Sequence, residues 1–172
     1  ILLDSVTIRA EAGSVGNSPS APEPQYIVSE SVSADEPNQF NNIRDALDQA
    51  SEEAVIGIEP KSEGTYRDDA STPLAVSTAN VTLVGYNGTP EIKTSDGVGG
   101  GQSVLEIEAD GITLDGVDVT IPADRGNAVG VAGNDVTIRN STLDHAGSDT
   151  GSGTGGPLGF GSEKTGLTVE NN

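Results

Sequence analysis

Four segments of the chain repeat one pattern of apolar and polar positions. Each is a five-residue block with branched aliphatic residues at positions one and three, threonine at position two, and glycine or asparagine at position five. The blocks begin at Val81, Ile112, Val136 and Leu167. Seven positions before each block stands another apolar residue, namely Leu74, Leu105, Val129 and Phe160. Because strand side chains alternate between two faces, the pattern predicts strands that share one core, with one block per coil of a solenoid.

The remaining columns of the repeat predict how the coils stack. Strands of adjacent coils lie about 4.8 Å apart, so the threonines should form an exposed ladder of hydroxyls. Its members are Thr82, Thr113, Thr137 and Thr168. Glycine and asparagine enter left-handed backbone most cheaply, so we expect chain corners at position five. These corners are Gly85, Gly116, Asn140 and Asn171. At position four Arg139 falls between Asp115 and Glu170, which predicts a charge ladder across three coils.

An amphipathic helix and an N-terminal arm precede the repeat. Apolar residues at helical spacing predict a capping helix over about 40–52 with one buried face, carried by Phe40, Ile43, Leu47 and Ala50. Residues 26–172 then form a solenoid domain, and the Gly-, Ser- and Pro-rich segment 13–25 is a linker. Residues 1–12 alternate as a strand does, so we interpret them as an arm.

A further strand is expected after the corner in most coils, over 91–93, 117–121 and 141–143. Three strands per coil, joined by corner turns, resemble the right-handed parallel β-helix of the pectin lyase-like superfamily. Residues 40–66 are similar to its capping helix and first coil, with the patterns Phe-x-x-Ile-x-x-Ala-Leu, Ile-x-Ile-x-Pro and Gly-Thr-Tyr. The resemblance implies an all-β fold, a right-handed parallel β-helix with a short N-terminal capping α-helix and an extended arm. It leaves function open, because the superfamily includes lyases, esterases, hydrolases, tailspikes, adhesins and surface structural proteins.

The net charge of the chain argues against some classes of binding partner. Twenty-seven acidic and eight basic residues give a formal net charge of −19, which repels nucleic acid and anionic bilayers. The acids are spread along the chain, as in proteins of salt-loving archaea, where about 1 M salt screens charge to within about 3 Å. With no apolar run of about 18 residues, we expect no membrane insertion. Cysteine is absent, so no disulfide or thiolate metal site forms.

Candidate catalytic residues have a structural explanation as well. The resemblance implies that lyases of the superfamily use an acidic calcium site with a base, and that its esterases use paired aspartates with an arginine. The nearest residues here are Asp115, Asp118 and Arg139. The esterase-type sequences Gln-Asp-Thr-Leu and Asp-Phe-Ile-Phe-Gly are absent. Because the acidic neighbours already explain Arg139, we assign the group to a structural ladder and name no catalytic residue.

Other polar motifs carry weaker signals. The single histidine, His145, stands in a polar segment typical of a solvated loop. Calcium is the only cofactor that the acidic residues suggest, and the candidate ligands are Asp96, Asp144 and Asp149. No calcium-loop motif supports this site. The glycine-rich segments 97–101 and 151–156 lack the Gly-Lys-Ser/Thr ending of a phosphate loop, so we interpret them as insertions between strands.

Three asparagines stand in sequons for asparagine-linked glycosylation: Asn80, Asn87 and Asn140. Asn87 is the strongest candidate, because Gly88 beside it indicates a turn. Asn140 has a competing role at its corner.

The two ends of the sequence suggest self-association. The last block supplies one strand of a coil, so we expect an uncapped end, either because the chain is a fragment or because another subunit completes it. Val6 to Arg9 repeat the letters Val-Thr-Ile-Arg of residues 136–139. The arm therefore suits strand donation to a neighbour and head-to-tail assembly. Its apolar residues are Ile1, Leu2, Leu3, Val6 and Ile8.

These features favour a non-enzymatic extracellular or surface structural protein, such as a subunit of a filament, surface layer, adhesin or viral appendage. One alternative is a polysaccharide-active enzyme resembling a pectate lyase or pectin esterase. Another is a carbohydrate-binding module, against which the scarcity of aromatic residues counts.

Overall fold

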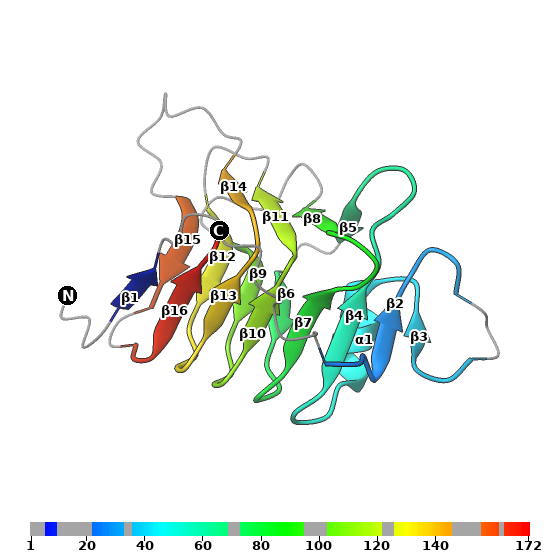
Figure 1. Cartoon of the computed structure of the whole chain (residues 1–172), viewed down its shortest axis with the longest axis horizontal. Coiled ribbons are helices and arrows are strands. Elements are labelled where there is room, and N and C mark those ends of the chain that lie inside the picture. The colour runs from blue at the N-terminus through cyan, green and yellow to red at the C-terminus, as the bar shows by residue number, and fades with distance from the viewer. Residues whose placement is uncertain are drawn as a thin grey trace.

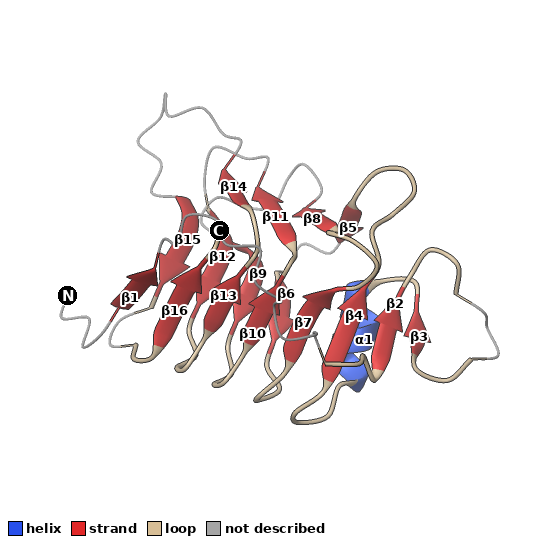
Figure 2. Cartoon of the chain, in the orientation of Figure 1, coloured by secondary structure: helices blue, strands red, loops and turns tan. Residues whose placement is uncertain are grey.

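The structure is a computed structural model. It describes residues 6–9, 22–32, 36–68, 73–94, 103–121, 126–145, 156–161 and 164–172. Within these ranges the strands form three parallel sheets that wind into one stack (Figure 1). Coloured by secondary structure, the regular elements of the described residues are strands, apart from one short helix (Figure 2). The predicted all-β parallel solenoid is therefore confirmed.

Four successive coils each contribute one strand to every sheet. The first sheet, sheet A, contains β4 (Val55–Ile58), β7 (Thr82–Gly85), β10 (Thr113–Asp115), β13 (Thr137–Arg139) and, after the four coils, β16 (Leu167–Glu170). Sheet B contains β5 (Tyr66–Asp68), β8 (Glu91–Thr94), β11 (Asp118–Ile121) and β14 (Leu143–His145). Sheet C contains β6 (Leu74–Val76), β9 (Ser103–Ile107), β12 (Asn127–Val131) and β15 (Gly156–Phe160).

A short helix covers the first coils. Strands β2 (Tyr26–Val28) and β3 (Gln39–Phe40) extend sheet A beyond β4, and α1 (Ile43–Gln49) follows. The helix is shorter than the expected 40–52, because Phe40 pairs within the sheet and Asn42 caps the N-terminus by accepting a 2.8 Å hydrogen bond from the Asp45 N–H. Its apolar face is buried, through Ile43, Ala46 and Leu47.

The core is built from columns of aliphatic residues. In sheet A, Leu83, Leu114 and Ile138 stand opposite one another in successive coils, and each is fully buried. The threonines of the predicted ladder are aligned in the same register, half-buried on the other face: Thr82, Thr113, Thr137 and Thr168. The block alignment derived from the sequence is therefore the register of the sheet.

One predicted column is wrong in the fourth coil. Leu105 stands opposite Leu74 and Val129, as expected, but the residue opposite Val129 is Leu158 rather than Phe160. Phe160 pairs with Val131 at the strand end and is 46% exposed. A shift of two residues keeps the same side chains on the same face, so alternation alone does not detect it.

Left-handed residues turn the chain on both sides of sheet A. Gly116, Asn140 and Asn171 have φ values of 68°, 53° and 54°, as expected for corners. Gly85 does not have a left-handed φ, so that part of the prediction is wrong. Its φ is ordinary, but a Cβ there would collide with the carbonyl oxygen of Gly116 in the next coil. Glycine is needed at this corner for close approach.

A second left-handed column was not predicted. The residue immediately before each block has a positive φ: Asn80 (60°), Gly111 (74°), Asp135 (53°) and Gly166 (71°). The backbone N–H groups here bond to the next coil, with Asn80 donating to the Asp110 carbonyl at 3.0 Å and Gly111 donating to that of Asn134 at 2.9 Å. The signal was present, since these residues are Asn, Gly or Asp.

The N-terminal strand lies at the far end of the stack. Strand β1 (Val6–Arg9) pairs in parallel with β16, so sheet A runs from β1 through β16 to β2 and β3 (Figure 1). This pairing corrects the expectation of an uncapped end for sheet A, because the arm of the same chain occupies the β16 edge. Residues Ile1, Leu2 and Leu3 lie outside the described ranges.

The other two sheets end differently. In the described part of the chain, β14 and β15 are the outermost strands of sheets B and C. Three apolar residues of the last strands, β14, β15 and β16, are only partly buried, namely Leu143, Leu158 and Val169. Their partners one coil earlier are fully buried: Val119, Val129 and Ile138. The end of the stack is therefore less completely covered than its interior.

Candidate functional site

A column of charged residues runs along sheet A at position four of the block. Arg139 contacts Asp115 through two nitrogens, with Nε donating to Oδ2 at 3.0 Å and Nη2 lying 3.0 Å from the same oxygen. Asn140 Nδ2 donates to the other oxygen, Asp115 Oδ1, at 2.7 Å. Asp115 is therefore held by two side chains of the next coil.

The column continues to the end of the sheet. Glu170 stands opposite Arg139, and on its other side it stands opposite Arg9 of β1. Along Asp115, Arg139, Glu170 and Arg9 the sign of the charge alternates at every step. The predicted position of Arg139 between Asp115 and Glu170 is confirmed by the register, and among the described side chains its guanidinium forms an ion pair with Asp115 alone.

The three residues considered for catalysis all make contacts between coils. Asp115 and Arg139 form the ion pair, as the structural interpretation expects. Asp118 begins β11 in sheet B, and its Oδ1 accepts a 2.9 Å hydrogen bond from the Thr142 N–H of the following coil. Each of the three thus has a defined role in holding adjacent coils in register.

The three sequon asparagines share one geometry. Each has a left-handed backbone and lies at least partly open to solvent. The side-chain nitrogen to which a glycan would be attached donates to an acid in every case: Asn80 to Glu52 at 3.1 Å, Asn87 to Glu59 at 2.8 Å, and Asn140 to Asp115 at 2.7 Å. The sequence indicated that a structural role at a chain corner competes with glycosylation at Asn140, and the structure shows a structural role of this kind for all three asparagines.

The metal candidates are only partly described. Asp144 is exposed on β14, whereas Asp96, Asp149 and the side chain of His145 lie outside the described parts. Among the residues described, no three or more acidic or histidine side chains gather in a way that suits a metal ion. Segments 97–101 and 151–155 also lie outside the described ranges. Nor do those ranges contain a helix of the length and apolarity that a bilayer crossing needs.

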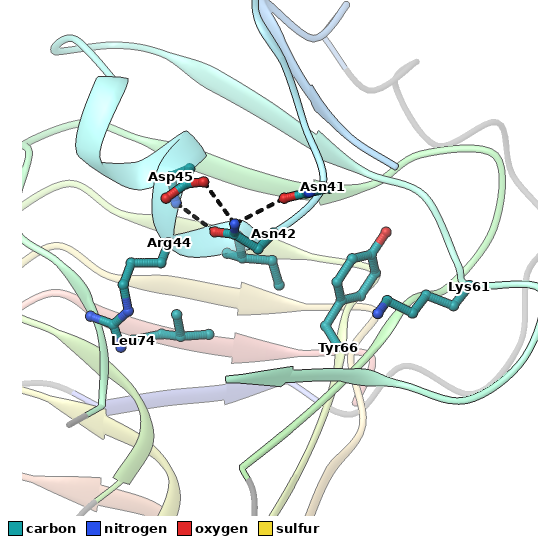
Figure 3. Close-up of a pocket in the computed structure, with 8 residues that line it drawn as sticks. Asn41, Asn42, Arg44, Asp45, Lys61, Tyr66 and Leu74 are labelled. Carbon is teal, nitrogen blue, oxygen red and sulfur yellow. Dashed lines mark hydrogen bonds between the residues drawn. The ribbon is translucent and has the colours of Figure 1, made fainter. Parts of the chain in front are cut away.

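A cavity of about 280 Å³ lies beside the capping helix. Arg44 enters it from α1, and Lys61 and Tyr66 come from the loop before β5 and from β5 itself (Figure 3). The Lys61 ammonium is 4.7 Å from the centroid of the Tyr66 ring, close enough for a cation–π interaction. Arg44 Nη2 donates to the Pro73 carbonyl oxygen at 3.2 Å.

The opposite wall of this cavity is polar. Asn42 Nδ2 donates to Asp45 Oδ2 at 2.7 Å and to Asn41 Oδ1 at 3.0 Å (Figure 3). Buried Ile43 and Leu74 complete the lining. Sequence reasoning missed this cavity, because its two cations come from a helix and a loop with no shared spacing.

Tyr66 is the most strongly perturbed ionisable group of the cavity. Burial raises its pKa to about 12, and the nearby charges of Glu30 and Glu59 add to the effect. Its hydroxyl donates to the Glu59 carbonyl oxygen at 2.7 Å, a bond that a phenolate cannot make. Backbone and hydroxyl donors of Ser62 lower the pKa of the exposed Glu30 carboxyl.

The raised pKa predicts a loss of stability in alkali. The phenol ionises near its ordinary value of 10.0 in the unfolded chain and only near 12 in the folded chain. Its contribution to stability is therefore complete below pH 10 and falls as the pH rises from 10 to about 12. Absorbance of tyrosinate, followed against pH, should show a transition near pH 12 that Tyr66→Phe removes. If that variant keeps the late transition, the assignment to Tyr66 is wrong.

Comparison with protein-family models, curated proteins and solved structures gives no match. The protein is thus classified by its own fold, as a parallel β-solenoid protein with a helix at one end.

Proposed function

We propose that this protein is a non-enzymatic structural protein. It is a rigid, acidic β-solenoid rod that works in an extracellular or surface assembly, of the kind found in filaments, surface layers, adhesins and viral appendages. The main support is that the three residues considered for catalysis form bonds from one coil to the next. They are Asp115, Asp118 and Arg139. Their chemistry serves the length and stiffness of the stack.

Continuous backbone pairing supports a stiff element. The sheets run without interruption through four coils, with strands hydrogen-bonded to both neighbours in the interior. Polar ladders at the corners add side-chain bonds, as where Asp110 Oδ1 accepts from the Asn134 N–H at 2.7 Å and from Asn134 Nδ2 at 3.1 Å. Bending such a stack strains every ladder at once, because each coil is held around its whole circumference.

The proposal also covers the superfamily of the fold and the environment in which the protein works. We assign the coils to the right-handed β-helices of the pectin lyase-like superfamily, on the three-strand coil and the capping segment 40–66. A net charge of −19 suits a salt-rich exterior, where self-repulsion is screened. Exposed Asn87 is the proposed glycan site, and attachment there replaces its hydrogen bond to Glu59.

The cavity beside α1 supports a second candidate, binding of an acidic sugar. Two of the eight basic residues of the chain, Arg44 and Lys61, line it together. A carboxylate of the sugar can accept from one of these cations while the sugar ring contacts the cavity wall. This candidate corresponds to the carbohydrate-binding or polysaccharide-active alternatives, and its volume of about 280 Å³ sets the scale of one or two sugar units.

Electron microscopy of the purified protein in molar salt tests the leading proposal. Rods or filaments of regular width are the expected result. Incubation with uronic polymers should release neither unsaturated nor de-esterified sugars, and titration with oligogalacturonate should give the same heat for the protein and for Arg44→Gln/Lys61→Gln. Dispersed monomers that release sugar products would overturn the proposal in favour of an enzyme. Saturable heat that the double variant lacks would favour the binding module.

A further inference from the structure

The outer edge of β16 is a slot for a strand of defined sequence. Strand β1 fills it in parallel, with Val6 opposite Leu167 and Ile8 opposite Val169. The same four letters, Val-Thr-Ile-Arg, occupy residues 136–139 on the other side of β16. Strand β16 thus lies between two copies of one sequence, so the slot offers β1 the register of an internal coil.

The charge column selects the strand that enters this slot. Glu170 stands between Arg139 and Arg9 in the register, and the Arg139 guanidinium is paired with Asp115. Arg9 therefore puts a residue of opposite charge at the register position next to Glu170, at the edge of the sheet. Opposite charges at facing positions stabilise a strand pair, and like charges destabilise it. A strand shifted by one residue would lose this match and also turn its apolar residues to the wrong face.

The length of the connection between β1 and β2 bears on whether the β1 of another copy can occupy the β16 edge. Twelve residues, 10–21, separate β1 from the next described residue, and in the sheet order β1 lies six strand positions from β2. Six spacings are about 29 Å. A Gly/Ser-rich segment of this length has a root-mean-square span of about 19 Å and a full reach of about 40 Å. Closing within one chain is feasible, but it demands more than the average span.

Pairing between two copies shortens that distance. If the helix-capped end of a second copy stands over the β16 end of the first, the second copy's β1 lies next to its own β3, two positions from β2. Two spacings are about 10 Å, well within the average span. Effective concentration is higher when the connection is not stretched, so the geometry favours exchange once copies are concentrated.

We propose that β1 is exchanged between copies of this chain, so that the β1 of one copy occupies the β16 edge of the next. The chain with β1 on its own β16 is then the closed, unassembled form. This inference rests on the proposed structural function. Every strand contact of the closed form is regained in the exchanged form, as in domain swapping. Because β1 is connected to β2 near the helix-capped end of the stack, whereas the acceptor edge of β16 lies at the other end, the contact is head-to-tail and propagates into an open chain.

Cysteine cross-linking tests the exchange, and the chain offers a background free of native cysteine. Thr7 stands opposite Thr168, and neighbouring parallel strands place Cα atoms within disulfide range. A tagged Thr7→Cys chain and an untagged Thr168→Cys chain are unfolded together, refolded in molar salt and oxidised. The expected product is a covalent heterodimer. The matched control pairs Thr7→Cys with Thr113→Cys, which lies on the same ladder inside the stack, and should yield at least about fivefold less heterodimer.

The doubly substituted chain separates the two forms. Thr7→Cys/Thr168→Cys should give bridged monomers in dilute solution and a growing series of covalent oligomers as the protein concentration rises. Bridged monomers alone at every concentration, with mixed chains no better than the Thr113→Cys control, would overturn the exchange. If regular rods are still seen, the structural function stands without it. Monomers that release sugars would instead remove the function on which the inference rests.

A charge cycle tests the selection by Glu170. In the cross-linking assay Arg9→Glu should lower the heterodimer yield at least about fivefold, because the substitution puts a second carboxylate opposite Glu170. When the acceptor chain also carries Glu170→Gln, the same arm substitution should change the yield by less than about twofold. An equal loss in both backgrounds would show that the arm is not selected by this charge.

Discussion

Replacing Leu114 with alanine should lower the free energy of unfolding by about 3 kcal/mol. Leu114 is fully buried in β10, and both of its neighbours in the column, Leu83 and Ile138, are fully buried as well. Truncation removes apolar contacts with the coil on each side and leaves a cavity that rigid sheets cannot close. The effect is large because a solenoid has a thin core, in which one side chain fills much of a coil.

Denaturant unfolding in molar salt, followed by circular dichroism, measures this change. The matched control is Thr113→Ala in the same strand, since Thr113 stands on the outer ladder and should cost less than about 1 kcal/mol. Equal losses for the two variants would contradict the assignment of inner and outer faces.

Replacing Gly85 with alanine should cost about 2 to 3 kcal/mol. The added Cβ would collide with the carbonyl oxygens of Gly116 and Gly88, and both are backbone atoms that cannot rotate away. The corner between the second and third coils must then move, which strains the ladders on each side. The cause is close approach of backbone, since Gly85 itself has no left-handed φ.

Gly156→Ala is the control for this substitution. Among the described residues, and apart from its neighbours in the chain, no atom lies within 4 Å of a Cβ at Gly156, and its φ is not left-handed. Stability should therefore stay the same or rise by up to about 1 kcal/mol, because alanine restricts the unfolded chain. Thermal unfolding of the two variants at one salt concentration gives the comparison. A Gly85→Ala protein as stable as Gly156→Ala would mean that the coils are not held at this spacing.

Most of the fold could be predicted from the columns of the repeat, because each column is occupied by residues that meet one physical requirement: burial, exposure on a strand, or a turn. Threonine, aliphatic and Gly/Asn positions recur together, so the amino-acid pattern alone predicts the register of Thr82, Thr113, Thr137 and Thr168. The Asp115–Arg139 ion pair followed from the same alignment. Register is strongly encoded in such a fold because a slip of one residue turns the whole apolar set outward.

The wrong predictions concern features that the repeat pattern does not determine. A slip of two residues keeps the facing of side chains, so Phe160 was placed where Leu158 stands. Gly85 was assigned a left-handed corner from its residue type, although steric approach to Gly116 is what requires glycine there. The cavity at Arg44 and Lys61 depends on how a loop folds over the capping helix, and the repeat contains no information about that arrangement.

The stacking of coils also bears on how such a protein can change over generations. Register-equivalent Thr113 and Thr137 are 24 residues apart, and Thr82 and Thr168 each lie 31 residues from the nearest of them. A tandem duplication of one such stretch in the gene would place matching strands, corners and core columns against those already present. The length of the molecule can therefore evolve in increments of about 4.8 Å, with no new side-chain contact to invent.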